Sequence, residues 1–386
     1  MSRQGAAIRL AAYYAALFAA VGVQLPFWPV WLADRGLGAA QIGVVVSLTY
    51  LIRLAVNPVV GAVVDRRGDR RLPMLVLAAG AAAAWTLFAA TGGFWAILAV
   101  TALAVGLWGG IMPVGDSLAM MSAQEWRLDY GRVRLWGSAA FIATAVFGGK
   151  LLMHAPPSVL VWLIAGLLGA TALVCLALPD LRAPADTDPA PTLRPLLSGA
   201  PFLLFLAFAG LNQASHTVYY AFATLHWRAA GIPGDTIGLL WSEGVLAEIV
   251  LFAISGPVVR RLGPGGLLLA AGLGGVLRWT ILAATTWVPV LAAAQVLHAA
   301  TFGCAHLGAM HFIQRAVPAR LGVRAQGLYA GIAAGAVPGL ATPLAGWLYQ
   351  HVAGGAFLAM AASSLGAAGM AWALTRRWHG GKVVAG

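Results

Sequence analysis

Charged residues are scarce in this sequence: Asp, Glu, Lys and Arg together make up 9% of its 386 residues, and only 12 residues are acidic. A soluble globular domain averages about 25% charged residues, so this chain has too little charge to cover a surface that faces water. Apolar residues take up 61% of the chain, without counting its 48 glycines. The composition excludes a soluble enzyme domain and predicts a polytopic α-helical membrane protein.

Cysteine is also rare, and both copies, Cys175 and Cys304, lie inside apolar stretches. Neither a disulfide framework nor a cysteine zinc site is expected from them. The patterns H-E-x-x-H and G-x-S-x-G, typical of metalloproteases and serine hydrolases, are absent from the sequence. We therefore expect no bound metal, no cofactor and no enzymatic activity.

Long apolar runs account for nearly the whole chain. A membrane-spanning helix needs about 20 mostly apolar residues, and twelve runs of at least that order are present. They cover residues 9–33, 39–64, 73–91, 94–122, 133–154, 157–178, 199–226, 235–259, 265–284, 287–314, 324–350 and 353–375. The sequence thus predicts an all-α protein with twelve transmembrane helices.

Basic residues are segregated between the loops on the two sides of these runs. Of the 24 Lys and Arg residues, 19 fall on the side of the N-terminus and 3 on the other side, while Arg53 and Arg278 lie within apolar runs. Cytoplasmic loops carry such an excess of basic residues, so both termini are predicted to be cytoplasmic. The net charge of +12 is then a signal of topology, and no nucleic-acid partner is expected.

The chain repeats itself about its midpoint. The segment G-A-V-V-D-R-R-G from Gly61 is echoed by G-P-V-V-R-R-L-G from Gly256, and R-x-x-G occurs at both Arg134 and Arg324. A stretch rich in Pro and Asp at residues 179–198 separates the halves and is typical of a flexible linker. We predict an N-terminal six-helix bundle over 1–178, a cytoplasmic linker, and a C-terminal six-helix bundle over 199–386, with the binding site between the bundles.

The loop after the second run carries a known motif. Its sequence, G-A-V-V-D-R-R-G-D-R-R from Gly61, resembles the loop motif G-x-x-x-D-R-x-G-x-[RK]-[RK] of the major facilitator superfamily. The resemblance implies the fold of that superfamily, with Gly61, Asp65, Arg66 and Gly68 as a gating motif. Asp65 would pair with arginines of the opposed bundle as a cytoplasmic latch; the alternative is a plain basic loop that sets topology.

A narrower resemblance covers nearly the whole chain. The segments D-Y-G-R-V-R-L-W-G-S from Asp129, L-P-F-W from Leu25 and V-L-R-W from Val276 are similar to the bacterial phenylpropionate permease branch, which is related to the lactose permease and other proton symporters. The resemblance implies a multi-pass transporter of the bacterial-type inner membrane. Four positions match the polar residues of the lactose permease, namely Asp116, Arg134, Arg278 and His298.

The proton site of the sugar permease is not carried over, because its carboxylate three residues after that histidine is replaced here by Thr301. Glu248 is the expected substitute. Ionisable groups within the membrane are functional by default, and a carboxyl group in a low-dielectric cavity can hold a proton near neutral pH and release it to water or an arginine. We therefore assign proton coupling to Glu248, Arg278 and His298; a static Glu248–Arg278 pair is the alternative.

Two further charged groups point to the substrate. Asp116 and Arg134 lie on consecutive antiparallel runs and are expected to pair, either to orient the substrate or to neutralise each other. Arg53, counted with Arg134 and Arg278 against Asp116 and Glu248, leaves the expected cavity with net positive charge. A guanidinium within the membrane favours a carboxylate, which it binds with two hydrogen bonds.

Aromatic side chains would hold the remainder of such a substrate, because their ring faces suit a flat apolar group. The candidates are Tyr14, Tyr219, Tyr220 and Trp279. His216 lies beside two of them in the sequence and would either donate a hydrogen bond to the substrate or simply pack in the core.

The sequence thus predicts a monomeric proton symporter in the lipid bilayer that imports a small aromatic carboxylate such as 3-phenylpropionate by alternating access. A proton symporter for a sugar or nucleoside is the nearest alternative, favoured if Asp116 and Arg134 clamp the substrate. A small-molecule exporter on the same scaffold is a second alternative.

Overall fold

The structure, a computed structural model, describes residues 1–182 and 194–383. The central part of the predicted linker, residues 183–193, lies outside the described residues. Throughout the described ranges the regular structure is helical, and the single β-type contact is an isolated bridge between Asp69 and Arg182.

Two compact units divide the chain: Met1–Asp188 with Gly231–Ser242, and Pro189–Ala230 with Glu243–Gly386. Apart from the start of α11 described below, the first unit contains α1 (Arg3–Asp34), α2 (Ala39–Arg67), α3 (Arg71–Thr86), the 3-10 turn η1 (Leu87–Ala90), α4 (Gly93–Gly109), α5 (Ile111–Trp126), α6 (Tyr130–Leu151) and α7 (Val159–Cys175). The division into bundles 1–178 and 199–386 stays a prediction.

Helices of the second unit are more often interrupted. They are α8 (Arg194–Leu197), α9 (Ala200–Ala214), α10 (Thr217–Ala229), α11 (Gly234–Ala253), α12 (Ser255–Ala284), α13 (Val288–Val296), the π-helix η2 (Ala299–Cys304), α14 (Ala305–Ala316), η3 (Ala319–Leu321), α15 (Gly322–Gly331), the π-helix η4 (Ile332–Ala336), α16 (Val337–Val352), η5 (Ala353–Gly355) and α17 (Ala356–Arg377). The first residues of α11, up to Ser242, belong to the first unit.

Joined across their kinks, these elements confirm the twelve predicted spans within the described residues. Eight stretches are long and apolar enough to cross a membrane by themselves. One of them, Arg324–Arg377, holds two spans that meet at Ala353, where the backbone turns to φ 44°. Gly263, at φ 64° and ψ 174°, breaks α12 in the same way and separates the predicted spans 235–259 and 265–284.

One predicted span, 199–226, is broken in the structure between α9 and α10. The hydroxyl of Ser215 donates to the carbonyl of Asn212 at 2.6 Å, and that of Thr217 donates to the carbonyl of Ala214 at 2.8 Å. Side chains of this kind compete with the backbone for helix carbonyls. The break places His216 at the junction, where it becomes part of the site described below.

In unit 1, α1 packs along α6 and also contacts α5. The phenol of Tyr13 on α1 donates to the carbonyl of Ile111 at 2.8 Å, and a β-carbon at Gly115 would overlap this phenol. Gly115 therefore lets α5 approach α1 closely. The contact sets the neighbouring Tyr14 against Asp116, the residue that follows Gly115.

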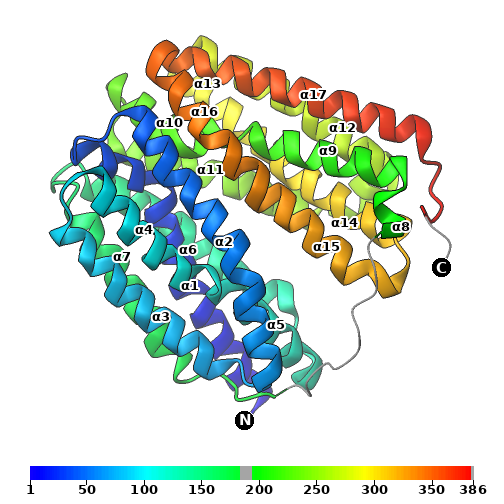
Figure 1. Ribbon diagram of the computed structural model, residues 1–386, viewed down its shortest axis with the longest axis horizontal. Coiled ribbons are helices and arrows are strands. Elements are labelled where there is room, and N and C mark those ends of the chain that lie inside the picture. The colour runs from blue at the N-terminus through cyan, green and yellow to red at the C-terminus, as the bar shows by residue number, and fades with distance from the viewer. Residues whose placement is uncertain (183–193, 384–386) are drawn as a thin grey trace. The chain divides into compact units, whose positions relative to one another are not determined.

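In unit 2, α17 runs along both α12 and α9 (Figure 1). Gly272 on α12 faces the backbone of Ala368 on α17, and a β-carbon at Gly272 would lie 2.7 Å from the Ala368 nitrogen. Seven residues further along α12, about two turns, the indole of Trp279 donates to Ser364 at 3.1 Å. This close packing fixes the part of α12 that carries Arg278.

Candidate functional site

A buried polar cluster surrounds Arg278 in unit 2. Its guanidinium donates to His298 Nδ1 at 3.0 Å, to Thr301 Oγ1 at 3.1 Å and to Gln295 Oε1 at 2.7 Å. Arg278 is 0% exposed, as are Thr301 and Gln295. The guanidinium is thus removed from water while all three of these acceptors are neutral groups.

Aromatic rings cover the faces of the same guanidinium. Its central carbon lies 4.6 Å from the ring centroid of Tyr219 and 4.7 Å from that of Trp279. Such cation–π contacts replace part of the lost hydration of a buried cation. Tyr219 also donates its hydroxyl to Gln295 Oε1 at 3.0 Å. The structure therefore brings together Arg278, Tyr219 and Trp279, and the role of the two rings in holding a substrate stays a prediction.

His298 connects Arg278 to Glu248. A guanidinium has only donors, so Nδ1 of His298 must accept the hydrogen bond and the proton of the neutral ring sits on Nε2. That nitrogen lies 3.7 Å from Glu248 Oε2, and the two side chains are 11% and 19% exposed. The three residues assigned to proton coupling thus lie in sequence, with His298 between Arg278 and Glu248, and their role in coupling stays a prediction.

His216 packs against the same cluster. Its ring contacts Trp279 edge-on at a centroid distance of 5.0 Å and stacks on Tyr220 at 5.7 Å. Nδ1 lies 2.8 Å from the carbonyl of Asn212, which only accepts, so Nδ1 carries the proton of the neutral ring. The remaining nitrogen, Nε2, is buried and has no hydrogen-bond partner within the described part of the chain. In its neutral form His216 therefore offers Nε2 as an acceptor. Its N–H, the donor expected from the sequence, is already hydrogen-bonded to the carbonyl of Asn212.

Three residues of this cluster were not singled out as functional by the sequence reasoning: Asn212, Gln295 and Thr301. Asn212 donates its amide to the Thr301 carbonyl at 3.1 Å, within the π-helix η2. π-Helical segments are frequent at functional sites. The available signal was an amide in an apolar run, since side chains that hydrogen-bond between membrane helices are of this kind.

Unit 1 holds a second polar cluster, on Asp116. Its Oδ1 accepts from Tyr14 at 2.6 Å, from Tyr130 at 3.2 Å and from Arg134 at 3.2 Å. The central carbon of Arg134 lies 5.4 Å from the centroid of the Tyr14 ring and 5.2 Å from that of Phe18. The predicted Asp116–Arg134 pair is present, with side chains 35% and 33% exposed. Its role in binding stays a prediction.

Arg53 is placed differently from Arg134 and Arg278. It lies on α2, and its Nε is buried without a hydrogen-bond partner among the residues that the structure describes, as is Oδ1 of Asn57 one turn later. No acidic side chain in the described ranges forms an ion pair with it. Gly109 leaves room for its stem, because a β-carbon there would lie 2.9 Å from Arg53 Cγ.

The gating motif forms a compact loop between α2 and α3. Gly68 ends α2 in the left-handed conformation at φ 69°, and Asp65 pairs with Arg70 at 3.7 Å. Arg70 also donates to Ser117 Oγ at 2.9 Å and to the Gly68 carbonyl at 3.0 Å. Arg66 is exposed and Gly61 has open space beside it. The latch function stays a prediction.

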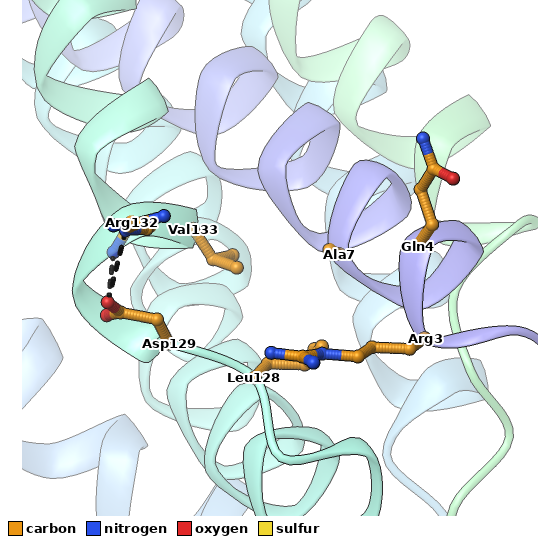
Figure 2. A pocket seen from close by; sticks show the side chains of 7 residues that line it. All are labelled: Arg3, Gln4, Ala7, Leu128, Asp129, Arg132 and Val133. Carbon is orange, nitrogen blue, oxygen red and sulfur yellow. Dashed lines mark hydrogen bonds and ion pairs between the residues drawn. The ribbon is translucent and has the colours of Figure 1, made fainter.

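A pocket in unit 1 shares no lining residue with the cluster on Arg278 or with the cluster on Asp116 (Figure 2). It is lined at the starts of α1 and α6 by Arg3, Gln4, Ala7, Leu128, Asp129, Arg132 and Val133. Asp129 caps α6 and pairs with Arg132 at 3.4 Å. Across the described residues, His, Cys, Asp and Glu form no group of three or more that could hold a metal ion.

Known proteins similar to this chain include ones named as transporters or permeases. The model of the MFS_1 like family matches residues 7–359. A probable 3-phenylpropionic acid transporter of Escherichia coli (strain K12) is 33% identical and covers 92% of this chain and 94% of the relative. A maltose permease of Geobacillus stearothermophilus is 28% identical and covers 88% and 86%.

A solved structure of a mutant of the nucleoside transporter NupG is similar over 97% of this chain and 100% of its own, with a TM-score of 0.86 at 15% identity. At that identity the likeness concerns the fold. It shows the arrangement of twelve transmembrane helices in two pseudo-symmetric six-helix bundles.

Proposed function

We propose that this chain, which belongs to the MFS_1 like family of the major facilitator superfamily, is a proton symporter. It would import a small aromatic carboxylate such as 3-phenylpropionate. That it is a membrane transporter of small molecules and not an enzyme follows from the family. We further propose that it lies in a bacterial inner membrane with both termini in the cytoplasm.

The observation that carries the proposal is the charge balance around Arg278. A charge inside a membrane is costly unless it is paired, and the three hydrogen-bond acceptors of this buried guanidinium are neutral. The nearest negative charge in this series of contacts is Glu248, beyond His298. Arg278 thus depends on the ionisation of Glu248 through an intervening histidine.

This dependence supplies a physical reason for symport. When Glu248 binds a proton, its negative charge disappears and Arg278 is left uncompensated. A carboxylate then binds more favourably, because it restores the charge balance. By reciprocity, a bound carboxylate favours protonation of Glu248. Proton and monoanion load together, so the transported pair is electroneutral.

Arg53, which lies in unit 1, is a second reason to expect an anionic substrate. It has no acidic partner in the described ranges, whereas Arg134 is paired with Asp116. A guanidinium offers its donors in a fork that matches a carboxylate. Tyr14, Tyr219, Tyr220 and Trp279 are the proposed ring contacts for the aromatic part of the substrate. The printed name of the relative with 33% identity, a probable 3-phenylpropionic acid transporter, agrees with this class.

Uptake into proteoliposomes tests the proposal. We expect labelled 3-phenylpropionate to accumulate when the outside is made acidic, and to follow the pH gradient more than the membrane potential, because the loaded pair carries no net charge. Protein-free liposomes at the same pH gradient are the control for passive entry of the neutral acid. Protein-dependent uptake that ignores an imposed proton gradient would refute proton coupling.

A sugar symporter is the second candidate, since the maltose permease is 28% identical and the Asp116–Arg134 pair is partly open to solvent. A thermal-shift screen of aromatic acids, sugars and nucleosides decides between the two. Stabilisation by a neutral glycoside and by no organic acid would favour the sugar.

A further inference from the structure

We propose that Gln295 is a positioning residue that holds Arg278 in place without neutralising it, and so sets the preference of the site for a carboxylate over a neutral ligand. The inference rests on the proposed function, because it concerns the same guanidinium.

Arg278 and Tyr219, which both donate to the Gln295 side chain, fix the orientation of its amide. Oε1 accepts from Arg278 at 2.7 Å and from the Tyr219 hydroxyl at 3.0 Å. A guanidinium only donates, so the atom facing it has to be the amide oxygen. Gln295 lies on α13 one turn before His298, and it thereby joins three elements of unit 2, α10, α12 and α13.

The neutrality of this acceptor has an electrostatic consequence. A glutamate is nearly the same size and would place a carboxylate at 2.7 Å from the guanidinium, forming a direct ion pair. With glutamine the hydrogen bond is kept and the positive charge stays unbalanced at close range. Glutamine and glutamate would therefore both fit the shape of the site, but glutamine, unlike glutamate, leaves the positive charge of Arg278 available to a ligand.

Two buried donors of the cluster that lack an acceptor in the described part of the chain also favour a negatively charged ligand. Nε2 of Gln295 and Nε of Arg278 are buried and have no acceptor within the described residues. Buried polar groups are normally hydrogen-bonded, so these two donors on adjoining side chains remain available to an anionic ligand, although Nε2 of His216 is an acceptor that also has no partner within the described residues. A substrate carboxylate supplies what is lacking once the side chains move to admit it.

Three variants of the full-length protein test the inference. Gln295→Glu adds the charge in nearly the same shape, Gln295→Met removes the amide and leaves the charge of Arg278 unbalanced, and Gln314→Glu adds an acid at an exposed position of α14. The probes are 3-phenylpropionate and its neutral amide, 3-phenylpropionamide. Dissociation constants are measured on purified protein for both.

We expect Gln295→Glu to weaken binding of the acid by about tenfold or more, the scale of a charge-assisted contact, with little change for the amide. Gln295→Met should keep the preference for the acid, even if both ligands bind less well, and Gln314→Glu should behave like the unmodified protein. Equal losses for both ligands in both Gln295 variants would show a merely structural role and overturn the inference. So would an unchanged acid preference in Gln295→Glu. An unmodified protein that does not distinguish acid from amide would instead count against the proposed function itself.

Discussion

At the scale of single residues, Arg53, Arg134 and Arg278 differ in how their charge is balanced. Arg134 has a direct partner in Asp116, Arg278 is linked to Glu248 through His298, and Arg53 has no acidic partner in the described ranges. Because an unbalanced guanidinium attracts an anion most strongly, Arg53 and Arg278 are the arginines on which carboxylate binding should depend.

Replacing Arg53 with alanine should weaken binding of 3-phenylpropionate by about tenfold or more, since a hydrogen bond to a charged group contributes about 1.5–3 kcal/mol. Binding of the neutral amide should change little. Titration of both ligands measures the difference, and Arg228→Ala, at an exposed arginine, is the matched control. Equal weakening of acid and amide would remove Arg53 from the carboxylate site.

At the scale of helices, the pattern of apolar runs predicts the twelve spans, because each must supply about 20 apolar residues to cross the bilayer. The Asp116–Arg134 pair also follows from the sequence, since consecutive antiparallel helices bring those positions together. The break at Ser215 could not be predicted in the same way, because it depends on which carbonyl a hydroxyl group reaches in the folded chain.

The same limit explains the residues of the site that were missed. Glu248 and Arg278 can be identified from the sequence because they are charged residues in apolar runs. Gln295 is neutral, and its place in the site follows only from the hydrogen bonds that its oxygen accepts from Arg278 and Tyr219. The carbonyl of Asn212 accepts the hydrogen bond of the neutral His216 ring at Nδ1, so the contact agrees with a packed core histidine, and a role of His216 in binding stays a prediction. Contacts between distant parts of the chain decide both cases.

The packing of α12 on α17 gives a prediction at this scale. Gly272→Ala should destabilise the protein by about 1–3 kcal/mol, the usual range for overpacking a well-filled contact, because the added methyl meets the backbone of Ala368. Thermal unfolding in detergent measures the change. Gly369→Ala on α17 has open space around the new methyl group and should leave the unfolding temperature nearly unchanged. A similar loss in both variants would contradict the packing argument.

At the scale of the whole molecule, the asymmetry of basic residues predicts cytoplasmic termini. The native Cys175 and Cys304 are buried, at 0% and 7% exposure, so labelling of added cysteines by an impermeant maleimide should have a low background. In intact cells we expect Lys150→Cys to be labelled from outside and Arg377→Cys to be labelled only after the membrane is opened. The reverse pattern would show that the orientation is inverted.

The central claim is that a proton on Glu248 and a carboxylate in the site favour each other through Arg278. The most direct measurement compares two activities of Glu248→Gln in proteoliposomes: exchange of labelled for unlabelled 3-phenylpropionate, and accumulation driven by an inward proton gradient. Because glutamine imitates the protonated glutamate, exchange should continue while accumulation is lost. Accumulation that persists in this variant at the rate of the unmodified protein would contradict the account.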